Sequence, residues 1–207
     1  MFKTMTDFAH RWIADWASLG LSGDDACRDR LLASYADPAR HYHTLQHLGE
    51  CLDLFERVAH LAAQPGEAAL ALWFHDAVYV PLAKDNEARS ADWAIEALRA
   101  AGASATAIER IAALIMATAH HEAPAGSDAR LVIDIDLAIL GSAPVRFAEY
   151  EQQIRSEYAA VPADLYAEKR REVLAGFLAR PVIYATPALH AQLEEQARAN
   201  LRRAIGQ

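Results

Sequence analysis

Apolar residues recur along most of the chain with the period of an α-helix. Between residues 44 and 62, polar side chains such as Glu50, Asp53 and Arg57 are interspersed among apolar residues at helical spacing. Proline, glycine and capping residues separate the segments of this kind. The pattern predicts helices over residues 7–19, from Ser22 or Asp24 to about 35, and over 44–62, 65–76, 86–100, 105–121, 134–140, 144–158, 162–178 and 188–205.

The helix boundaries follow from local signals. Asp85 and Ser104 stand where N-caps are expected, Gly102 ends one helix, and residues 122–128 form a loop before the next helix. Alanine is frequent, β-branched runs are few, and no repeat or linker divides the chain. We therefore expect one all-α domain over residues 1–207, built of about 8–10 helices.

The most apolar stretch, residues 68–74, leads directly into His75 and Asp76. This stretch has no polar side chain, so it predicts a helix that is buried on most of its circumference. A buried carboxylate is costly unless a cation neutralises it, and a divalent metal suits imidazole and carboxylate together. A surface pair, with Asp76 capping the following helix, is the alternative, but the apolar run that precedes the pair disfavours it.

Further metal-ligating residues lie elsewhere in the chain. His47 shares one helical line with Cys51, Leu54 and Val58, so we expect its side chain to point inward. His43 precedes it by one turn. Asp134 and Asp136 are both embedded in apolar sequence and therefore need partners.

Four segments in this order resemble the HD superfamily of metal-dependent phosphohydrolases. Three of them contain the histidine and aspartate residues introduced above, and the fourth opens the helix predicted at residue 86. They are Tyr42-His43-Thr44-Leu45-Gln46-His47-Leu48, Trp73-Phe74-His75-Asp76-Ala77-Val78-Tyr79, Asp85-Asn86-Glu87-Ala88-Arg89-Ser90-Ala91 and Asp134-Ile135-Asp136-Leu137-Ala138-Ile139-Leu140-Gly141. Together with Arg155, Glu157, Tyr158 and residues 197–201, they cover nearly the whole chain.

The resemblance implies an HD-like helical bundle with one metal held by His47, His75, Asp76 and Asp136. Asp76 would be catalytic, and Glu87 would orient the attacking water. Asp136 fits the ligand position better than Asp134. Three roles stay open for Asp134: a helix cap, an acceptor of a hydrogen bond from a ligand histidine, or the metal ligand itself. A second metal would be bound, or the first metal's ligands would be contacted, by His43, His120, His121 and Asp134.

The function implied is hydrolysis of a small phosphorylated metabolite or nucleotide by a metal-activated water. Arg155, Tyr158 and Arg170 are the candidates for binding the substrate, with Arg171 beside them. Two alternatives remain. One is a di-iron HD-type oxygenase, which needs His120 or His121, and the other is a non-catalytic module that binds a metal or a nucleotide.

The composition limits the kinds of molecule that the protein is expected to bind. The net charge of −8 argues against binding a nucleic-acid polymer but allows a small anionic substrate. Two cysteines indicate a reducing, cytoplasmic setting, and neither a signal peptide nor a membrane-spanning run is expected. The histidine and aspartate ligands do not determine which metal binds, whether Mn, Fe, Co, Ni, Zn or Mg, nor whether one ion or two are bound.

Overall fold

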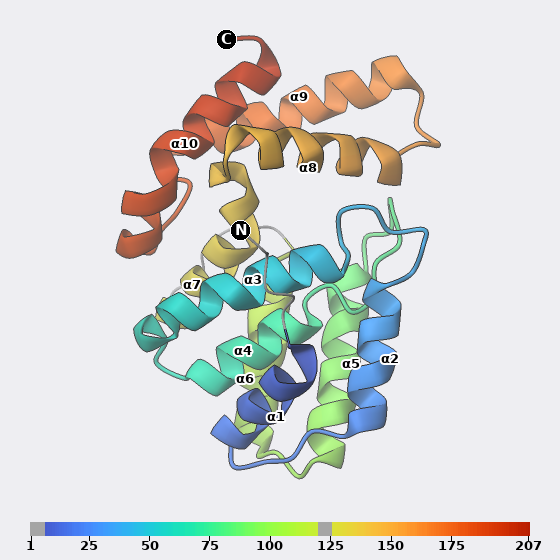
Figure 1. The fold of residues 1–207 in the computed structure, drawn as a ribbon, viewed down its shortest axis with the longest axis vertical. Coiled ribbons are helices and arrows are strands. Elements are labelled where there is room, and N and C mark those ends of the chain that lie inside the picture. The colour runs from blue at the N-terminus through green and yellow to red at the C-terminus, as the bar shows by residue number, and fades with distance from the viewer. Residues whose placement is uncertain (1–6, 120–125) are drawn as a thin grey trace. The chain divides into compact units, whose positions relative to one another are not determined.

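The computed structural model describes residues 7–119 and 126–207. Within these residues the secondary structure consists of α-helices and two short 3-10 helices, with no strand, so the predicted all-α class is confirmed (Figure 1). The α-helices are α1 (Phe8–Ser18), α2 (Asp25–Tyr35), α3 (Leu45–Val58), α4 (Pro65–Phe74), α5 (Asn86–Ala100), α6 (Ala105–Ala117), α7 (Ser127–Asp136), α8 (Pro144–Glu157), α9 (Ala163–Ala179) and α10 (Pro187–Ile205). The 3-10 helices are Ala59–Leu61 and Leu137–Gly141.

Side-chain capping explains several of the helix starts. The side chains of Asp24, Thr44 and Ser104 each accept a hydrogen bond from a backbone N–H in the first turn of α2, α3 and α6. Asp24 therefore caps α2, which decides between the two candidates for that position. Asp85 occupies the N-cap position of α5, but its side chain makes no capping hydrogen bond, so its expected capping role is not confirmed.

The largest boundary error concerns α7. A loop was expected up to residue 128 and a helix at 134–140, whereas α7 begins at Ser127, ends at Asp136 and continues as the 3-10 helix Leu137–Gly141. The Asp128 carboxylate accepts hydrogen bonds from the backbone N–H groups of Ala63 and Gln64. These bonds hold the first turn of α7 against the residues that precede α4. This tertiary contact cannot be read from local sequence.

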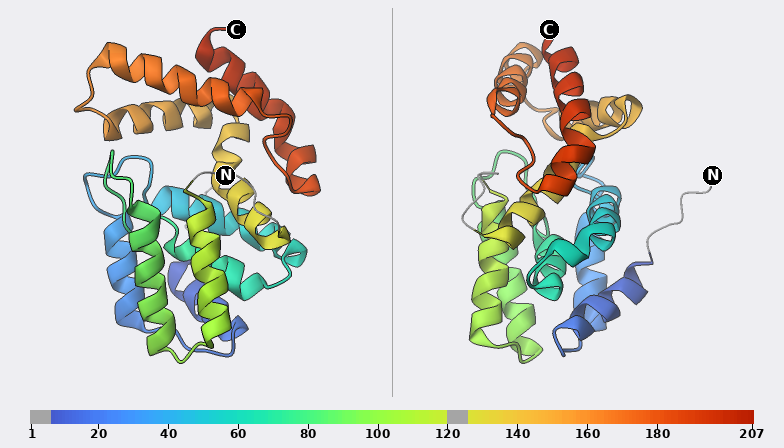
Figure 2. Two further views of the ribbon diagram at one scale, coloured as in Figure 1. Left: turned by 180° about the vertical axis from the view of Figure 1, so that it is seen from behind. Right: turned by 90° about the vertical axis from the view of Figure 1, so that its left-hand side faces the viewer.

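The chain divides into two compact units, the first ending at Ile133 and the second comprising Asp134–Gln207. In the first unit, α4 packs against α1, α3, α5 and α6, and all its residues from Gly66 to Phe74 are buried. The burial predicted for residues 68–74 is thereby confirmed. Figure 2 shows α5 and α6 side by side, and both pack against α4.

An aromatic cluster fills the core between α1 and α4. Trp12 lies at its centre, with ring centroids 5.3 Å from Trp16, 5.2 Å from Trp73 and 6.1 Å from Phe74. Trp12 has no exposed surface. Large buried aromatic side chains dominate core energetics, so this cluster fixes α1 against α4.

In the second unit, α10 packs against α9 and against the 3-10 helix Leu137–Gly141 (Figure 2). Glu194 of α10 accepts hydrogen bonds from the backbone N–H groups of Ile183 and Tyr184 and pairs with Arg198. The connection between α9 and α10 is thus held by buried polar contacts. No helix in the described ranges is both long enough and apolar enough to cross a membrane.

Candidate metal centre

Three predicted ligands converge in the first unit. His47 lies on the buried face of α3, His75 is the C-cap of α4, and Asp76 follows directly. The Nε2 atoms of His47 and His75 are 3.1 Å apart. The Asp76 Oδ2 atom lies 3.1 Å from Nε2 of His75 and 3.5 Å from Nε2 of His47. The apolar residues of α4 bury this end of the helix, which leaves His75 only 1% exposed.

The backbone sets the protonation of His75. Its Nδ1 atom lies 2.7 Å from the carbonyl oxygen of Leu72, which can only accept a hydrogen bond. Nδ1 therefore carries the proton, and in the neutral ring Nε2 presents a lone pair toward His47 and Asp76. A hydrogen bond from the far ring nitrogen to a carbonyl is how metal-binding histidines are commonly oriented.

The spacing of these three atoms fits a metal ion. Metal–ligand distances of about 2.0–2.2 Å place neighbouring nitrogen and oxygen ligands about 2.8–3.6 Å apart in tetrahedral or octahedral shells. The observed separations of 3.1 Å, 3.1 Å and 3.5 Å fall in this range. A cation between the two facing imidazole nitrogens also removes the repulsion between their lone pairs. The donor set therefore fits a divalent metal.

Asp76 is ionised in this setting although its side chain is only 14% exposed. Burial raises the pKa of its carboxyl group, but when the histidines are protonated and no metal is bound, the charges of His75 and His43 and hydrogen bonds from His47 and His75 lower it by more. The net result is a pKa well below the usual aspartate value. Asp76 is therefore a carboxylate, which is the form that binds a metal.

Cys51 is a neighbour of these ligands that the sequence placed on the inward line of α3 without assigning it to the metal. Its Sγ atom lies 3.7 Å from Nδ1 and 3.8 Å from Nε2 of His47. One ligand atom from each of His47, Cys51 and His75 lies within 4.8 Å of the others. A buried group of histidine, cysteine and aspartate thus has the composition and spacing to hold a metal ion.

Arg40 organises the backbone around the site, and no sequence pattern singled it out. Its guanidinium donates to the carbonyl oxygens of Asp76 at 2.7 Å, Ala77 at 2.9 Å and His43 at 3.2 Å. Its charged end lies 5.2 Å from the ring centre of Tyr35 and 5.9 Å from that of Tyr79. Arg40 is only 9% exposed, so it joins the two loops that carry site residues.

Tyr35 supports the same turn from the other side. Its hydroxyl donates to the carbonyl oxygen of Trp73 at 3.1 Å and accepts from the backbone N–H of Asp76 at 3.2 Å. The backbone on both sides of His75 is therefore fixed by one side chain of α2. Only the tertiary fold brings Tyr35 here, since it lies 41 residues before Asp76.

The His43 ring lies beside that of His47, with centroids 5.9 Å apart. Its ring stacks on that of Tyr79, with centroids 3.9 Å apart. Its expected role beside the metal or with a second one stays a prediction. His120 and His121, the other candidates for a second metal, lie outside the described residues.

Glu87 stands in the first turn of α5, half-buried. The start of this helix is fixed to the loop that follows Asp76, because the Asn86 side chain makes two hydrogen bonds of 3.0 Å with the backbone of Val80. Ser90 likewise bonds the backbone of Val78. The start of α5 is thus held against the loop that follows His75 and Asp76, as expected. The role of Glu87 toward a water stays a prediction.

Asp134 and Asp136 both lie in the last turn of α7. The Asp134 carboxylate accepts hydrogen bonds from the backbone N–H groups of Ala185 at 3.0 Å and Thr186. Thr186 is the N-cap of α10, so Asp134 stabilises the start of that helix. Asp136 is the last residue of α7. These contacts give Asp134 a structural role.

The predicted substrate-binding residues contact one another and their neighbours within the second unit. Arg155 donates to the carbonyl oxygens of Tyr158 at 2.6 Å and Val161 at 3.3 Å, which closes the C-terminal end of α8. Arg170 pairs with Glu151. These hydrogen bonds account for the orientation of both arginines, and the substrate-binding role of Arg155, Tyr158 and Arg170 stays a prediction.

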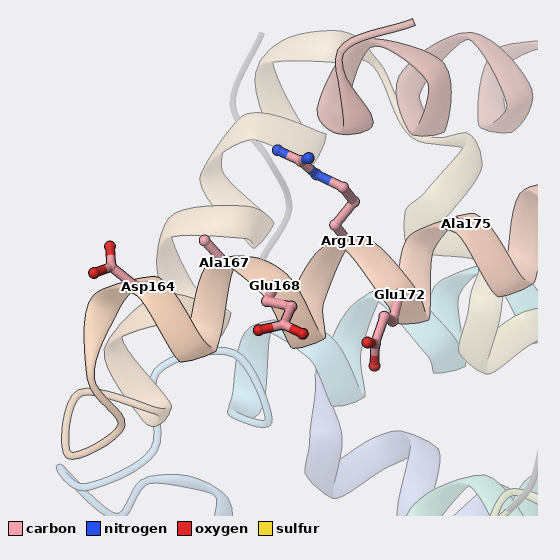
Figure 3. Close-up of a pocket in the computed structure, with 6 residues that line it drawn as sticks. All are labelled: Asp164, Ala167, Glu168, Arg171, Glu172 and Ala175. Atoms are coloured by element: carbon pink, nitrogen blue, oxygen red, sulfur yellow. The ribbon is translucent and has the colours of Figure 1, made fainter.

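A hollow on α9 includes Arg171, which the sequence also marked as a phosphate-binding candidate (Figure 3). Three carboxylates share its lining, those of Asp164, Glu168 and Glu172. In Figure 3 the Arg171 side chain extends away from the carboxylates of Glu168 and Glu172. One guanidinium among three carboxylates is a poor site for an anion, so this hollow adds nothing to the candidate metal centre.

No protein-family model, curated protein or solved structure matches the chain. The class that the structure itself defines is an all-helical protein with a buried histidine, cysteine and aspartate group suited to a metal ion.

Proposed function

We propose that the protein is a metal-dependent phosphohydrolase of the HD type, acting on a small phosphorylated metabolite or nucleotide. The observation that supports this most strongly is the convergence of His47 Nε2, His75 Nε2 and Asp76 Oδ2 at mutual distances of 3.1–3.5 Å. These are the first three ligands that the HD-like order of residues calls for.

Asp136 is the proposed fourth protein ligand, on the strength of the sequence pattern. One observation makes it the better choice than Asp134, because the Asp134 carboxylate is engaged by the backbone N–H groups of Ala185 and Thr186.

A divalent cation bound here supplies Lewis acidity toward a phosphate oxygen and lowers the pKa of a bound water. The residues of the chain do the rest. Asp76, ionised by its neighbours, accepts hydrogen bonds and balances positive charge. His75 holds its lone pair in position through Leu72. Glu87, at the start of α5, orients the attacking water.

The setting we propose is the cytoplasm, in keeping with two free cysteines, Cys27 and Cys51. A small anionic substrate suits a protein whose net charge is −8 only if positive charge is supplied locally. The metal supplies that charge, so we expect a metal-free chain to bind phosphate esters weakly.

The test is phosphate release by the full chain loaded in turn with Mn²⁺, Co²⁺, Zn²⁺ and Mg²⁺, from para-nitrophenyl phosphate and a panel of nucleotides. Asp76→Asn preserves the shape of the side chain and removes its charge. We expect it to lose both bound metal, measured by elemental analysis, and turnover.

Asp92→Asn is the matched control, because Asp92 is an exposed carboxylate on α5. We expect this variant to keep metal and activity. Wild-type turnover in Asp76→Asn would contradict the mechanism. Metal and nucleotide binding without turnover of any substrate would replace the proposed enzyme with a binding module.

A further inference from the structure

His47 and Cys51 form a pair on α3 that is separated by one helical turn. Residues four apart lie above one another on the same helix face. The sulfur faces the core, because Cys51 is 3% exposed and Leu54 and Val58 continue the same buried line. This is the spacing at which one helix presents two ligands to one ion.

The distance between the two side chains suits a shared cation. A tetrahedral ion bound about 2.05 Å from nitrogen and about 2.3 Å from sulfur separates these atoms by about 3.6 Å. Sγ of Cys51 lies 3.8 Å from Nε2 of His47, the nitrogen that faces His75 and Asp76. The sulfur lies beside the His47 ring rather than in line with the Nε2 lone pair, so rotation about the side-chain bonds of Cys51 or His47 is needed to bring both atoms onto one ion.

A thiol hydrogen bond explains this contact poorly. Sγ is almost equally far from the two nitrogens of the His47 ring, at 3.7 Å and 3.8 Å. The lone pair or N–H of each nitrogen points outward from its own side of the ring, so an equidistant sulfur is aligned with neither. One ligand atom from each of Cys51, His47 and His75 nevertheless lies within 4.8 Å of the others, close enough for the three side chains to surround one ion.

We infer that the Cys51 thiolate is a ligand of the cation held by His47, His75 and Asp76. This inference rests on the metal site of the proposed function. On binding, the S–H bond of Cys51 breaks, its proton passes to solvent water, and the sulfur electron pair forms the bond to the cation. No atom changes oxidation state. The thiolate joins the carboxylates of Asp76 and of the proposed ligand Asp136 in balancing the positive charge of the buried cation.

A thiolate ligand narrows the choice of metal that the sequence leaves open. Thiolate is a soft ligand that favours Zn²⁺, Co²⁺ and Fe²⁺, whereas Mg²⁺ and Mn²⁺ prefer oxygen ligands. The site is therefore selective for Zn²⁺, Co²⁺ or Fe²⁺ over Mg²⁺ and Mn²⁺.

The experiment is an anaerobic titration of the chelator-treated full chain with Co²⁺, followed by absorption spectroscopy. Bound Co²⁺ gives weak visible bands from its d electrons, and a thiolate ligand adds a strong charge-transfer band in the near ultraviolet. We expect both in the wild type. Cys51→Ser should lose the charge-transfer band and keep the visible bands.

Cys27→Ser is the matched control, since Cys27 is the only other cysteine and lies on α2. We expect its spectrum to equal that of the wild type. Visible bands without charge transfer in the wild type, or charge transfer retained in Cys51→Ser, would overturn the thiolate ligand and leave the metal site standing. No cobalt spectrum at all in the wild type would overturn the metal site itself.

X-ray absorption of the Zn²⁺-loaded wild type keeps the test independent of variant folding. A sulfur shell about 2.3 Å from zinc is the expected result. Nitrogen and oxygen scatterers alone would overturn the assignment of Cys51.

Discussion

Arg40 offers the sharpest test of how the metal site is held together. Its guanidinium bonds the carbonyl oxygens of Asp76, Ala77 and His43. Arg40→Lys keeps the positive charge, but an ammonium on a flexible stem cannot reproduce a planar fork that serves three carbonyls. We therefore expect the lysine variant to retain one of these hydrogen bonds and to lose two.

The magnitude follows from these contacts. A hydrogen bond from a charged donor contributes about 1.5–3 kcal/mol, so losing two lowers the free energy of unfolding by about 3 kcal/mol or more. The turn that carries Asp76 also loosens. Removing a partner that orients metal ligands typically weakens metal affinity about 10–100-fold, and we expect Arg40→Lys to fall in that range.

Two measurements separate these effects. Urea denaturation of the metal-free protein gives the loss of stability, and competition with a chromophoric chelator gives the change in Zn²⁺ affinity. Arg110→Lys is the control, because Arg110 makes two hydrogen bonds with the buried Glu67, near the opposite end of α4 from His75. If Arg40→Lys weakens Zn²⁺ binding no more than Arg110→Lys does, Arg40 does not position the ligands.

Other variants test the fold and the choice of ligand. Trp12→Ala should lower the unfolding free energy by about 3–5 kcal/mol in urea, and a loss below 1 kcal/mol would contradict its central place in the core. Asp134→Asn should lower the melting temperature and leave metal stoichiometry intact, while Asp136→Asn should lose metal; the reverse outcome would exchange their roles. Glu194→Gln should cost stability at neutral pH and progressively less in acid, and a difference independent of pH in thermal melts would refute this.

The sign of the Glu194 prediction comes from its contacts. Burial raises the pKa of its carboxyl group, but hydrogen bonds from Tyr184 N–H, Arg198 and Ile183 N–H lower it by more, so the net pKa is below the usual glutamate value. A depressed pKa in the folded state means that the carboxylate stabilises the fold above the usual glutamate pKa. That stability is lost as the pH falls through the lower, folded value, where the wild type and Glu194→Gln converge.

The sequence predicted elements best where the signal was local. The start of α4 at Pro65 and the caps Asp24 and Ser104 depend on neighbouring residues, and the structure confirms them. The start of α7 was missed, because it is anchored by Asp128, whose hydrogen-bonding partners lie 64 and 65 residues earlier in the chain.

The candidate site divides in the same way. His75 and Asp76 stood out because seven apolar residues precede them, and His47 because of its place on a helical line. Arg40 and Tyr35 gave no such signal, since arginines and tyrosines are common on helix surfaces and only the fold buries these two against the turn. Cys51 did have a signal, its spacing from His47, which becomes informative only once His47 is a candidate ligand.

The position of the site at the C-terminal end of α4 has an electrostatic basis. The last carbonyl groups of a helix lack partners within it and give its end a partial negative charge that favours a cation. Here Leu72 faces Nδ1 of His75, Trp73 accepts from Tyr35, and Phe74 accepts from the backbone N–H of Ala77. The carbonyl groups that end the helix therefore bond a candidate metal ligand, His75, and Tyr35, which supports the turn that carries Asp76. The same hydrogen bonds therefore terminate α4 and orient the candidate ligands, so the geometry of the candidate metal centre depends on how the buried helix ends.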